Sequence, residues 1–252
     1  MRILLTNDDG INAAGIHALK AALDPLGEVV MVAPERPRSA SGHAITLHKP
    51  LRIDEVALPG GGRGWATNGT PTDCVTLGFD VVMEGRVDLV VSGINDGPNL
   101  GWDLTYSGTV AAAIEGAILG APAFAISVAG DKGPYDYDPA ARFARRLAEE
   151  IRDRGLERFA LLNVNVPAVP ADQIRGVSIT RQGRRQYVDR IDKRIDPWGR
   201  PYYWLCGSLR EDEPDPDSDV HAVLENRIAV TPVHLDLTAT HLFPALREWR
   251  LQ

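Results

Sequence analysis

Short apolar runs alternate with stretches of helical spacing along the first two thirds of the chain. The apolar runs predict buried strands near residues 3–5, 29–33, 87–92, 124–128 and 159–164. Between them, apolar side chains recur every three or four residues. This spacing predicts helices from Ile16 to Leu23, from Thr70 onward, over 108–120 and from Asp138 to Gly155. Strands that alternate with helices are typical of a parallel sheet covered on both faces. The pattern therefore predicts an α/β fold, a Rossmann-like three-layer α/β/α sandwich with a mostly parallel sheet.

Two segments depart from this alternation. Residues 44–67 change to a period of two, broken by Pro50 and by a run of three glycines at 60–62, which predicts an inserted β-hairpin. After Pro167 the chain becomes rich in arginine and aromatic residues. Strand-like runs fall between residues 174 and 205 and from Arg227 to Val233, an acidic loop is expected over 211–219, and a short helix is expected in the last dozen residues.

The C-terminal segment lacks the apolar run that a separate core would need. We therefore expect residues 1–170 to form the Rossmann-like core that carries the chemistry. Residues 171–252 are expected to form a β-rich arm and tail that packs on this core and on partner subunits.

Composition and charge narrow the class of function. The chain has 252 residues, of which 44% are hydrophobic and 24% charged, as in folded soluble proteins. Its net charge of −7 argues against a surface for nucleic acid duplexes, although a metal ion and local arginines can still attract small anions. Two cysteines without CxxC spacing argue against a disulfide framework or a zinc-thiolate site. No apolar stretch is long enough to cross a membrane, and the first apolar run is too short for a signal peptide, so we expect a cytoplasmic protein.

Polar residues follow the predicted strands at the edge where open α/β sheets bind their ligands. Asp8 and Asp9 come directly after the first strand, and as bare neighbours they would repel each other. A divalent cation such as Mg²⁺ or Mn²⁺ removes that repulsion, and the Ser39 hydroxyl and the Asn95 amide oxygen would be neutral ligands. Taken alone, an Asp-Asp-Gly triplet is more often a turn with a helix cap.

A second candidate site opens the predicted helix over 108–120. The order Tyr106-Ser107-Gly108-Thr109 combines a helix N-terminus, a glycine and flanking hydroxyls, a combination that suits an anion. Ordinary capping by Ser107 or Thr109 explains the same residues equally well. The chain has neither a Walker A loop nor a Gly-x-Gly-x-x-Gly after its first strand, which argues against a P-loop enzyme and a nicotinamide dehydrogenase.

Taken together and in order, these motifs resemble those of the SurE (survival protein E) nucleotidases. The matching residues are Thr6 to Gly10, Ala33-Pro34 with Arg38-Ser39, Asn68 to Pro71, Ser92 to Asn95 with Gly97, Asn99 to Gly101, and Tyr106 to Val110. The resemblance implies a 5′-nucleotidase, a phosphoric monoester hydrolase that is often also active on 3′-nucleotides and sometimes on short polyphosphate. It also implies a homodimer or homotetramer interlocked by the C-terminal arms. The metal, one Mg²⁺, Mn²⁺ or Co²⁺ ion, would be bound by Asp8, Asp9, Ser39 and Asn95.

The expected reaction is hydrolysis of a nucleoside monophosphate by a water that attacks in line. Asp8 and Asp9 would be catalytic as well as metal ligands, because either can orient or deprotonate that water. Substrate and phosphate would be held by Asn68, Asn99, Ser107, Gly108 and Thr109. Two rival readings stay open: a nucleotide-binding module without turnover, and a structural oligomer in which the tail matters most.

Overall fold

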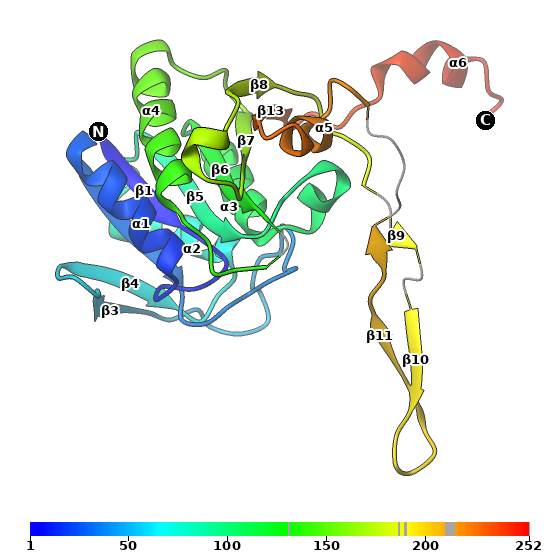
Figure 1. Ribbon diagram of the computed structural model, residues 1–252, viewed down its shortest axis with the longest axis horizontal. Coiled ribbons are helices and arrows are strands. Elements are labelled where there is room, and N and C mark those ends of the chain that lie inside the picture. The colour runs from blue at the N-terminus through cyan, green and yellow to red at the C-terminus, as the bar shows by residue number, and fades with distance from the viewer. Residues whose placement is uncertain (131, 186, 189–190, 210–214, 252) are drawn as a thin grey trace.

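A computed structural model of the chain describes all residues except 131, 186, 189–190, 210–214 and 252 (Figure 1). Its centre is a nine-stranded sheet with the order β3-β4-β2-β1-β5-β6-β7-β13-β8. The strands of this sheet are β1 (Arg2–Thr6), β2 (Glu28–Pro34), β3 (Ile53–Ala57), β4 (Arg63–Thr67), β5 (Leu89–Asp96), β6 (Ala123–Ala129), β7 (Ala160–Pro167), β8 (Val177–Ile179) and β13 (Ile228–His234).

The order of the parallel strands creates a switch point between β1 and β5. β1 pairs in parallel with β2 on one side and with β5 on the other, and the sheet continues in parallel through β6 to β7. From β1 the chain therefore moves outward through β2 first, and it returns to the other side of β1 with β5. Loops that leave the carboxyl ends of these two strands diverge and open a crevice, which is where α/β proteins bind ligands.

Helices cover both faces of the sheet, as expected for a three-layer sandwich (Figure 1). The apolar side chains of β1 alternate, with Ile3 and Leu5 on one face and Leu4 on the other, and each face has its own buried cluster. α1 and α4 pack on the first face, and α2 and α3 on the second. The helices are α1 (Ala14–Leu23), α2 (Pro71–Leu77), α3 (Gly108–Ile118), α4 (Asp138–Arg154), α5 (Asp219–Leu224) and α6 (Phe243–Arg247).

Short helical turns complete the body of the protein. They are η1 (Asp24–Leu26), η2 (Gly78–Val82), η3 (Gly101–Tyr106), η4 (Ala171–Gln173) and η5 (Thr240–Leu242). α2 begins with a complete capping box, in which Thr70 and Asp73 each accept from the other's backbone N–H. None of the described helices is long and apolar enough to cross a membrane.

The expected sandwich and hairpin are confirmed, with two corrections. Residues 44–52 are not strand: Leu47 is 85% exposed, and the backbone N–H of Thr46 bonds the Asp73 carboxylate instead of a neighbouring strand. The hairpin is confined to β3 and β4, and it extends the main sheet because β4 pairs in parallel with β2. The second correction is α5, which begins at the last residue of the expected acidic loop. Ser218 caps it by accepting from His221 N–H at 3.2 Å, a signal that the sequence carried.

The segment after residue 170 contributes to the sheet and also extends away from it. β13 pairs antiparallel with β7, and β8 pairs with β13. Between β8 and α5 the chain leaves the body as a long projecting hairpin (Figure 1). Its strands are β9 (Tyr187–Val188), β10 (Ile191–Ile195), β11 (Pro201–Leu205) and β12 (Ser208–Leu209). We call residues 187–209 the arm.

Candidate active site

Asp8 and Asp9 lie at the switch point, directly after β1. Their turn is fixed locally by Asn7, whose side chain donates to Gly10 O and accepts from Gly10 N–H, each at 3.1 Å. Gly10 has a φ of +98°, and a Cβ there would lie 3.3 Å from the backbone of Arg36. The turn therefore presents both carboxylates where the β1 and β5 loops diverge.

Asp8, Asn95 and Thr109 meet although they come from three distant parts of the chain. Asp8 is only 5% exposed, and the hydroxyl of Thr109, the second residue of α3, donates to its Oδ1. The same hydroxyl lies 3.2 Å from the amide oxygen of Asn95, which is near the end of β5. The side chain of Asn95 is in turn held by Gly97 O, to which its amide donates at 2.8 Å. Two of the expected metal ligands, Asp8 and Asn95, thus both contact the hydroxyl of an expected phosphate ligand, Thr109.

The electrostatics of the pair favour a cation beside the two carboxylates. Burial raises the pKa of the Asp8 carboxyl, although hydrogen bonds from Thr109 partly lower it. Burial first, and then the charge of Asp8, raise the pKa of Asp9 to about 6. Asp9 accepts a hydrogen bond from Asp96 N–H at 3.2 Å, and neither carboxylate makes an ion pair within the described part of the chain. A cation placed between them would reverse both shifts.

The beginning of α3 forms a tight cradle beside Asp8. A Cβ on Gly108 would lie 2.7 Å from Ser41 Oγ and 3.0 Å from Asp8 Oδ2, so only glycine leaves this space open. The Oγ of Ser41 is buried and has no hydrogen-bond partner among the residues that the structure describes. Ser107 acts as the N-cap and accepts from Val110 N–H at 3.1 Å. Capping by Ser107 and an open helix N-terminus at Gly108 therefore occur together, although sequence reasoning had treated them as alternatives.

The loop that carries Ser39 is attached to this cradle at two points. The backbone N–H of Arg38 donates to Asp8 O at 2.7 Å, and that of Gly42 donates to Tyr106 O at 3.0 Å. Ser39 itself is exposed, one residue from the contact with Asp8. The structure thus brings the Ser39 loop next to Asp8, and the role of Ser39 as a ligand stays a prediction.

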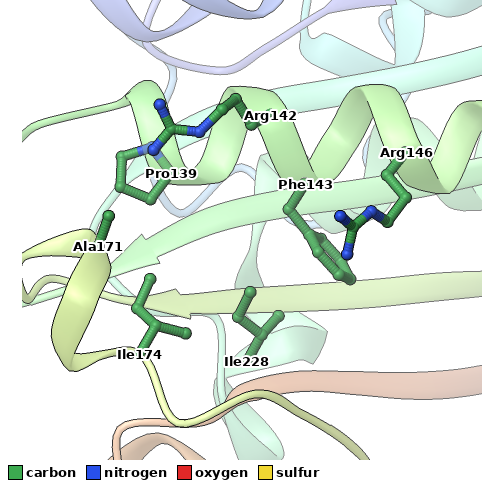
Figure 2. A pocket seen from close by; sticks show the side chains of 7 residues that line it. All are labelled: Pro139, Arg142, Phe143, Arg146, Ala171, Ile174 and Ile228. Carbon is green, nitrogen blue, oxygen red and sulfur yellow. The ribbon is translucent and has the colours of Figure 1, made fainter.

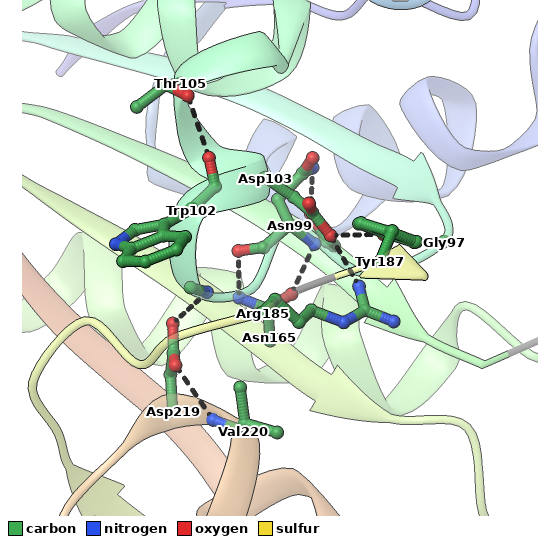
Figure 3. Close-up of polar contacts among 12 residues, drawn as sticks. Gly97, Asn99, Trp102, Asp103, Thr105, Asn165, Arg185, Tyr187, Asp219 and Val220 are labelled. Carbon is green, nitrogen blue, oxygen red and sulfur yellow. Dashed lines mark hydrogen bonds and ion pairs between the residues drawn. The ribbon is translucent and has the colours of Figure 1, made fainter. Parts of the chain in front are cut away.

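Asn68 and Asn99 mainly hold the backbone around the site. The amide oxygen of Asn68 accepts from Arg52 N–H at 3.0 Å. Asn99 is 7% exposed, and its amide donates to Ser127 Oγ at 2.8 Å while its backbone N–H donates to Asn165 Oδ1 at 2.8 Å (Figure 3). A substrate contact for either residue stays a prediction, because both side chains already bind parts of the protein.

Sequence reasoning missed three groups near the site. Ser41 lies two residues after Ser39, and its hydroxyl becomes notable only because the fold buries it against Gly108. The hydroxyl of Tyr137 donates to Asp96, whose backbone bonds Asp9. Asp219 bonds Gly101 N–H from 118 positions away. Ser41 precedes a glycine, and Tyr137 and Asp219 lie at the beginnings of α4 and α5, positions that are too frequent for polar residues to identify these three alone.

A separate hollow of about 290 Å³ lies between α4, η4 and β13 (Figure 2). Its lining combines apolar side chains with two arginines from α4, namely Pro139, Arg142, Phe143, Arg146, Ala171, Ile174 and Ile228. None of these residues belongs to the carboxylate site, and Arg142 is already paired with Asp138. The hollow is therefore distinct from the candidate active site.

Asp9→Asn is expected to stabilise the metal-free protein at alkaline pH. Because the folded Asp9 carboxyl has a pKa of about 6, above its unfolded value of 3.8, the folded state binds more protons between these values, and stability falls as the pH rises through them. The variant removes this penalty, on the order of 1 kcal/mol after solvent screening of a half-buried group. In EDTA it should melt a few degrees above the parent at about pH 8, with the gap narrowing toward about pH 4. Asp54→Asn, at an exposed aspartate on β3, is the matched control. A variant that melts below the parent at the higher pH would contradict this reading.

The chain is similar to known proteins in both sequence and structure. The family model described as "Survival protein SurE" matches residues 3–189. A protein of Moorella thermoacetica named 5′-nucleotidase SurE is 52% identical over 94% of this chain and 92% of its own. A Synechococcus protein of the same name is 48% identical over 100% and 98%. The crystal structure of the SurE protein from Aquifex aeolicus superimposes with a TM-score of 0.86 at 41% identity and covers 98% of each chain.

The match extends through the carboxylate turn, the β5 loop and the beginning of α3, and the solved structure shares the arrangement of the whole chain. The chain described here belongs to the SurE family.

Proposed function

We propose that this protein is a metal-dependent 5′-nucleotidase that hydrolyses nucleoside 5′-monophosphates to nucleoside and phosphate. The observation that carries the proposal is the meeting of Asp8, Asp9 and Asn95 with the open N-terminus of α3 at Gly108. The pair of carboxylates suits a cation, and the helix N-terminus beside it suits an anion. Two relatives named 5′-nucleotidase SurE support the same activity.

The donor set fits a hard divalent ion. Asp8, Asp9 and the amide oxygen of Asn95 supply oxygen ligands, and Ser39 would add a hydroxyl from the adjoining loop. The described residues contain no group of three or more histidine, cysteine, aspartate or glutamate side chains placed to bind a metal, so a zinc-type site is a poorer fit. When bound, Mg²⁺, Mn²⁺ or Co²⁺ would withdraw charge from the phosphate and lower the pKa of water.

The protein's own groups divide the remaining work. Asp8 is fixed by Thr109 and would keep its place, whereas the half-buried Asp9 would orient the attacking water and accept its proton. The buried hydroxyl of Ser41 and the first amides of α3 would donate to phosphate oxygens. One P–O bond to water forms as the P–O ester bond breaks, and the leaving nucleoside oxygen takes up a proton from solvent to give the free hydroxyl.

The test is phosphate release from EDTA-treated protein. A panel of 5′- and 3′-nucleoside monophosphates and short polyphosphate is assayed without metal and with Mg²⁺, Mn²⁺ or Co²⁺ restored. We expect release only with metal and chiefly from 5′-monophosphates. Metal-dependent nucleotide binding without release would instead favour a nucleotide-binding module, and full release in EDTA would exclude a metal-dependent mechanism.

The arm supports a further proposal, that the protein is a homodimer or homotetramer. Large apolar side chains on it face solvent, among them Trp198 at 77%, Trp204 at 59% and Leu205 at 88% exposure. Exposed apolar surface of this kind marks protein contacts. A second copy of this chain suits these residues because the relatives share the whole length, arm included. Sedimentation of the chain with and without residues 191–205 tests this.

We also expect a cytoplasmic location, in keeping with only two cysteines and a buried thiol at Cys74.

Gly108→Ala should reduce catalysis with little effect on folding. The added Cβ would lie 2.7 Å from Ser41 Oγ and 2.9 Å from Asp8 Cβ, so the carboxylate and the loop must move apart. Displacement by a few tenths of an ångström to one ångström at a reacting centre costs up to about a hundredfold, and we expect a loss of that order in kcat/KM. Alanine favours the helix by up to ~1 kcal/mol, so the melting temperature should hardly change.

Gly116→Ala is the matched control on the same helix. Its Cβ would lie nearest to the side chain of Val90, at 2.7 Å, in the core. It should lower stability and leave the activity per folded molecule near that of the parent. Equal activity of Gly108→Ala and the parent would show that the cradle does not bind the reacting phosphate.

A further inference from the structure

The η3 turn connects the arm to the phosphate cradle. It begins at Gly101 and ends at Tyr106, one residue before the N-cap Ser107 and two before Gly108. Two peptide units span at most about 7.6 Å between Cα atoms. A residue at the end of η3 is therefore within one nucleoside length of a phosphate held at the first amides of α3.

Hydrogen bonds and an ion pair hold the beginning and the middle of η3. At its beginning, the buried carboxylate of Asp219 accepts from Gly101 N–H at 2.8 Å and from Gly183 N–H at 2.9 Å (Figure 3). In its middle, Asp103 accepts from Arg185 at 2.8 Å and from the Tyr187 hydroxyl at 2.7 Å. These contacts attach the turn to α5 and to Gly183, Arg185 and Tyr187, which we call the root of the arm.

At its end, Tyr106 is tied to the Ser39 loop through its carbonyl, which accepts from Gly42 N–H at 3.0 Å. Its side chain is 63% exposed, and its hydroxyl has no hydrogen-bond partner among the described residues. The backbone of Tyr106 is thus held beside the cradle, while most of its large aromatic side chain is exposed to solvent. Nothing in the packing of the core explains an aromatic residue at this place.

A nucleoside monophosphate presents an aromatic base one sugar away from its phosphate. Bases stack on aromatic side chains with little regard to sequence, because every base has a π-face. We propose that Tyr106 is a specificity-determining residue that stacks on the base of the substrate while the phosphate lies in the Gly108 cradle. This rests on the proposed nucleotidase function and deepens it. Recognition by stacking accepts any base and favours purines, which have the larger ring.

The test compares two substrates that differ only by the base. AMP and ribose 5-phosphate carry the same sugar phosphate, so the ratio of their kcat/KM values isolates the contribution of the base. Stacking worth about one tenfold step in affinity should disappear in Tyr106→Ala, mainly through a higher KM for AMP, and the ratio should fall about tenfold. Tyr106→Phe keeps the ring and should keep the ratio. The loss should be larger for AMP than for CMP.

Trp102→Ala is the matched control. Trp102 is the other exposed aromatic of η3, at 46% exposure, and it follows Gly101 at the end that Asp219 holds rather than at the cradle. This variant should keep the ratio of AMP to ribose 5-phosphate. The stabilisation of each variant by Mn²⁺, measured as a melting shift, confirms that the metal site is intact.

The other possible results distinguish failure of the stacking role from failure of the nucleotidase function. An unchanged ratio in Tyr106→Ala, an equal loss for both substrates, or a change of oligomeric state in place of the KM effect would each overturn the stacking role and leave the nucleotidase function standing. If the parent protein releases no phosphate from any nucleotide, the proposed function itself fails. That result is seen before any variant is compared.

Discussion

Asp8→Ala is expected to reduce phosphate release from nucleoside 5′-monophosphates about a thousandfold while the protein stays folded. The carboxylate of Asp8 is fixed by the Thr109 hydroxyl next to Gly108, so its removal leaves the cation without its most rigid ligand. Stabilisation of transition-state charge by a bound metal is worth several kcal/mol, and each 1.4 kcal/mol is about tenfold in rate.

The fold should tolerate this substitution. Burial raises the pKa of the Asp8 carboxyl, so the ionised form is unfavourable in the metal-free protein. Its loss takes an acceptor from the Thr109 hydroxyl and from the backbone N–H groups of Asp8 and Thr109. Asn95 Oδ1 already lies 3.2 Å from that hydroxyl and can accept from it. The melting temperature without metal should therefore stay within a few degrees of the parent.

Two measurements separate loss of metal from loss of fold. Steady-state phosphate release reports catalysis, and the melting shift on adding Mn²⁺ reports metal binding; Asp8→Ala should lose both. Asp54→Ala removes an exposed aspartate from β3 and should lose neither. Asp8→Ala with normal turnover would refute the site, and lost turnover with an unchanged Mn²⁺ shift would assign Asp8 to chemistry rather than to the metal.

The carboxylate turn could be predicted because its chemistry is local. Asp8 and Asp9 are adjacent, follow an apolar run and precede a glycine, so a single segment of sequence shows both the position and the unfavourable charge. Asn95 follows another predicted strand in the same manner. Strand ends lie at one edge of a parallel sheet, and proximity of these residues follows from the fold class.

The contacts that shape the site could not be read from the sequence because they depend on strand order. Thr109 reaches Asp8 only because β5 lies beside β1, and periodicity does not determine which strands are neighbours. Ser41 is a candidate only because the fold buries its hydroxyl without a partner in the described part of the chain. The same reasoning explains the loop at 44–52, where Asp73 supplied a side-chain acceptor that replaced the strand pairing expected from alternation.

Asp219→Ala is expected to lower stability by on the order of 3 kcal/mol, or roughly 10 °C in melting temperature. The fully buried carboxylate accepts from three backbone N–H groups, those of Gly101, Gly183 and Val220, at 2.8 to 2.9 Å. Alanine would leave these donors buried without an acceptor, at about 1–3 kcal/mol for each that water cannot reach. Relief of the buried charge offsets part of this, since burial raises the pKa of Asp219.

The matched control is Asp217→Ala, the same change at an exposed position two residues earlier, which should leave the melting temperature unchanged. Hydrogen exchange adds a local measurement: the amides of Gly101 and Gly183 should lose protection in Asp219→Ala before the core strands do. Asp219→Asn keeps one acceptor oxygen and should fall between the parent and the alanine variant. If Asp219→Ala and Asp217→Ala have the same melting temperature, the carboxylate does not hold η3 to the root of the arm. If it melts early with unchanged exchange at Gly101, the loss arises in α5 rather than at the contact between arm and active site.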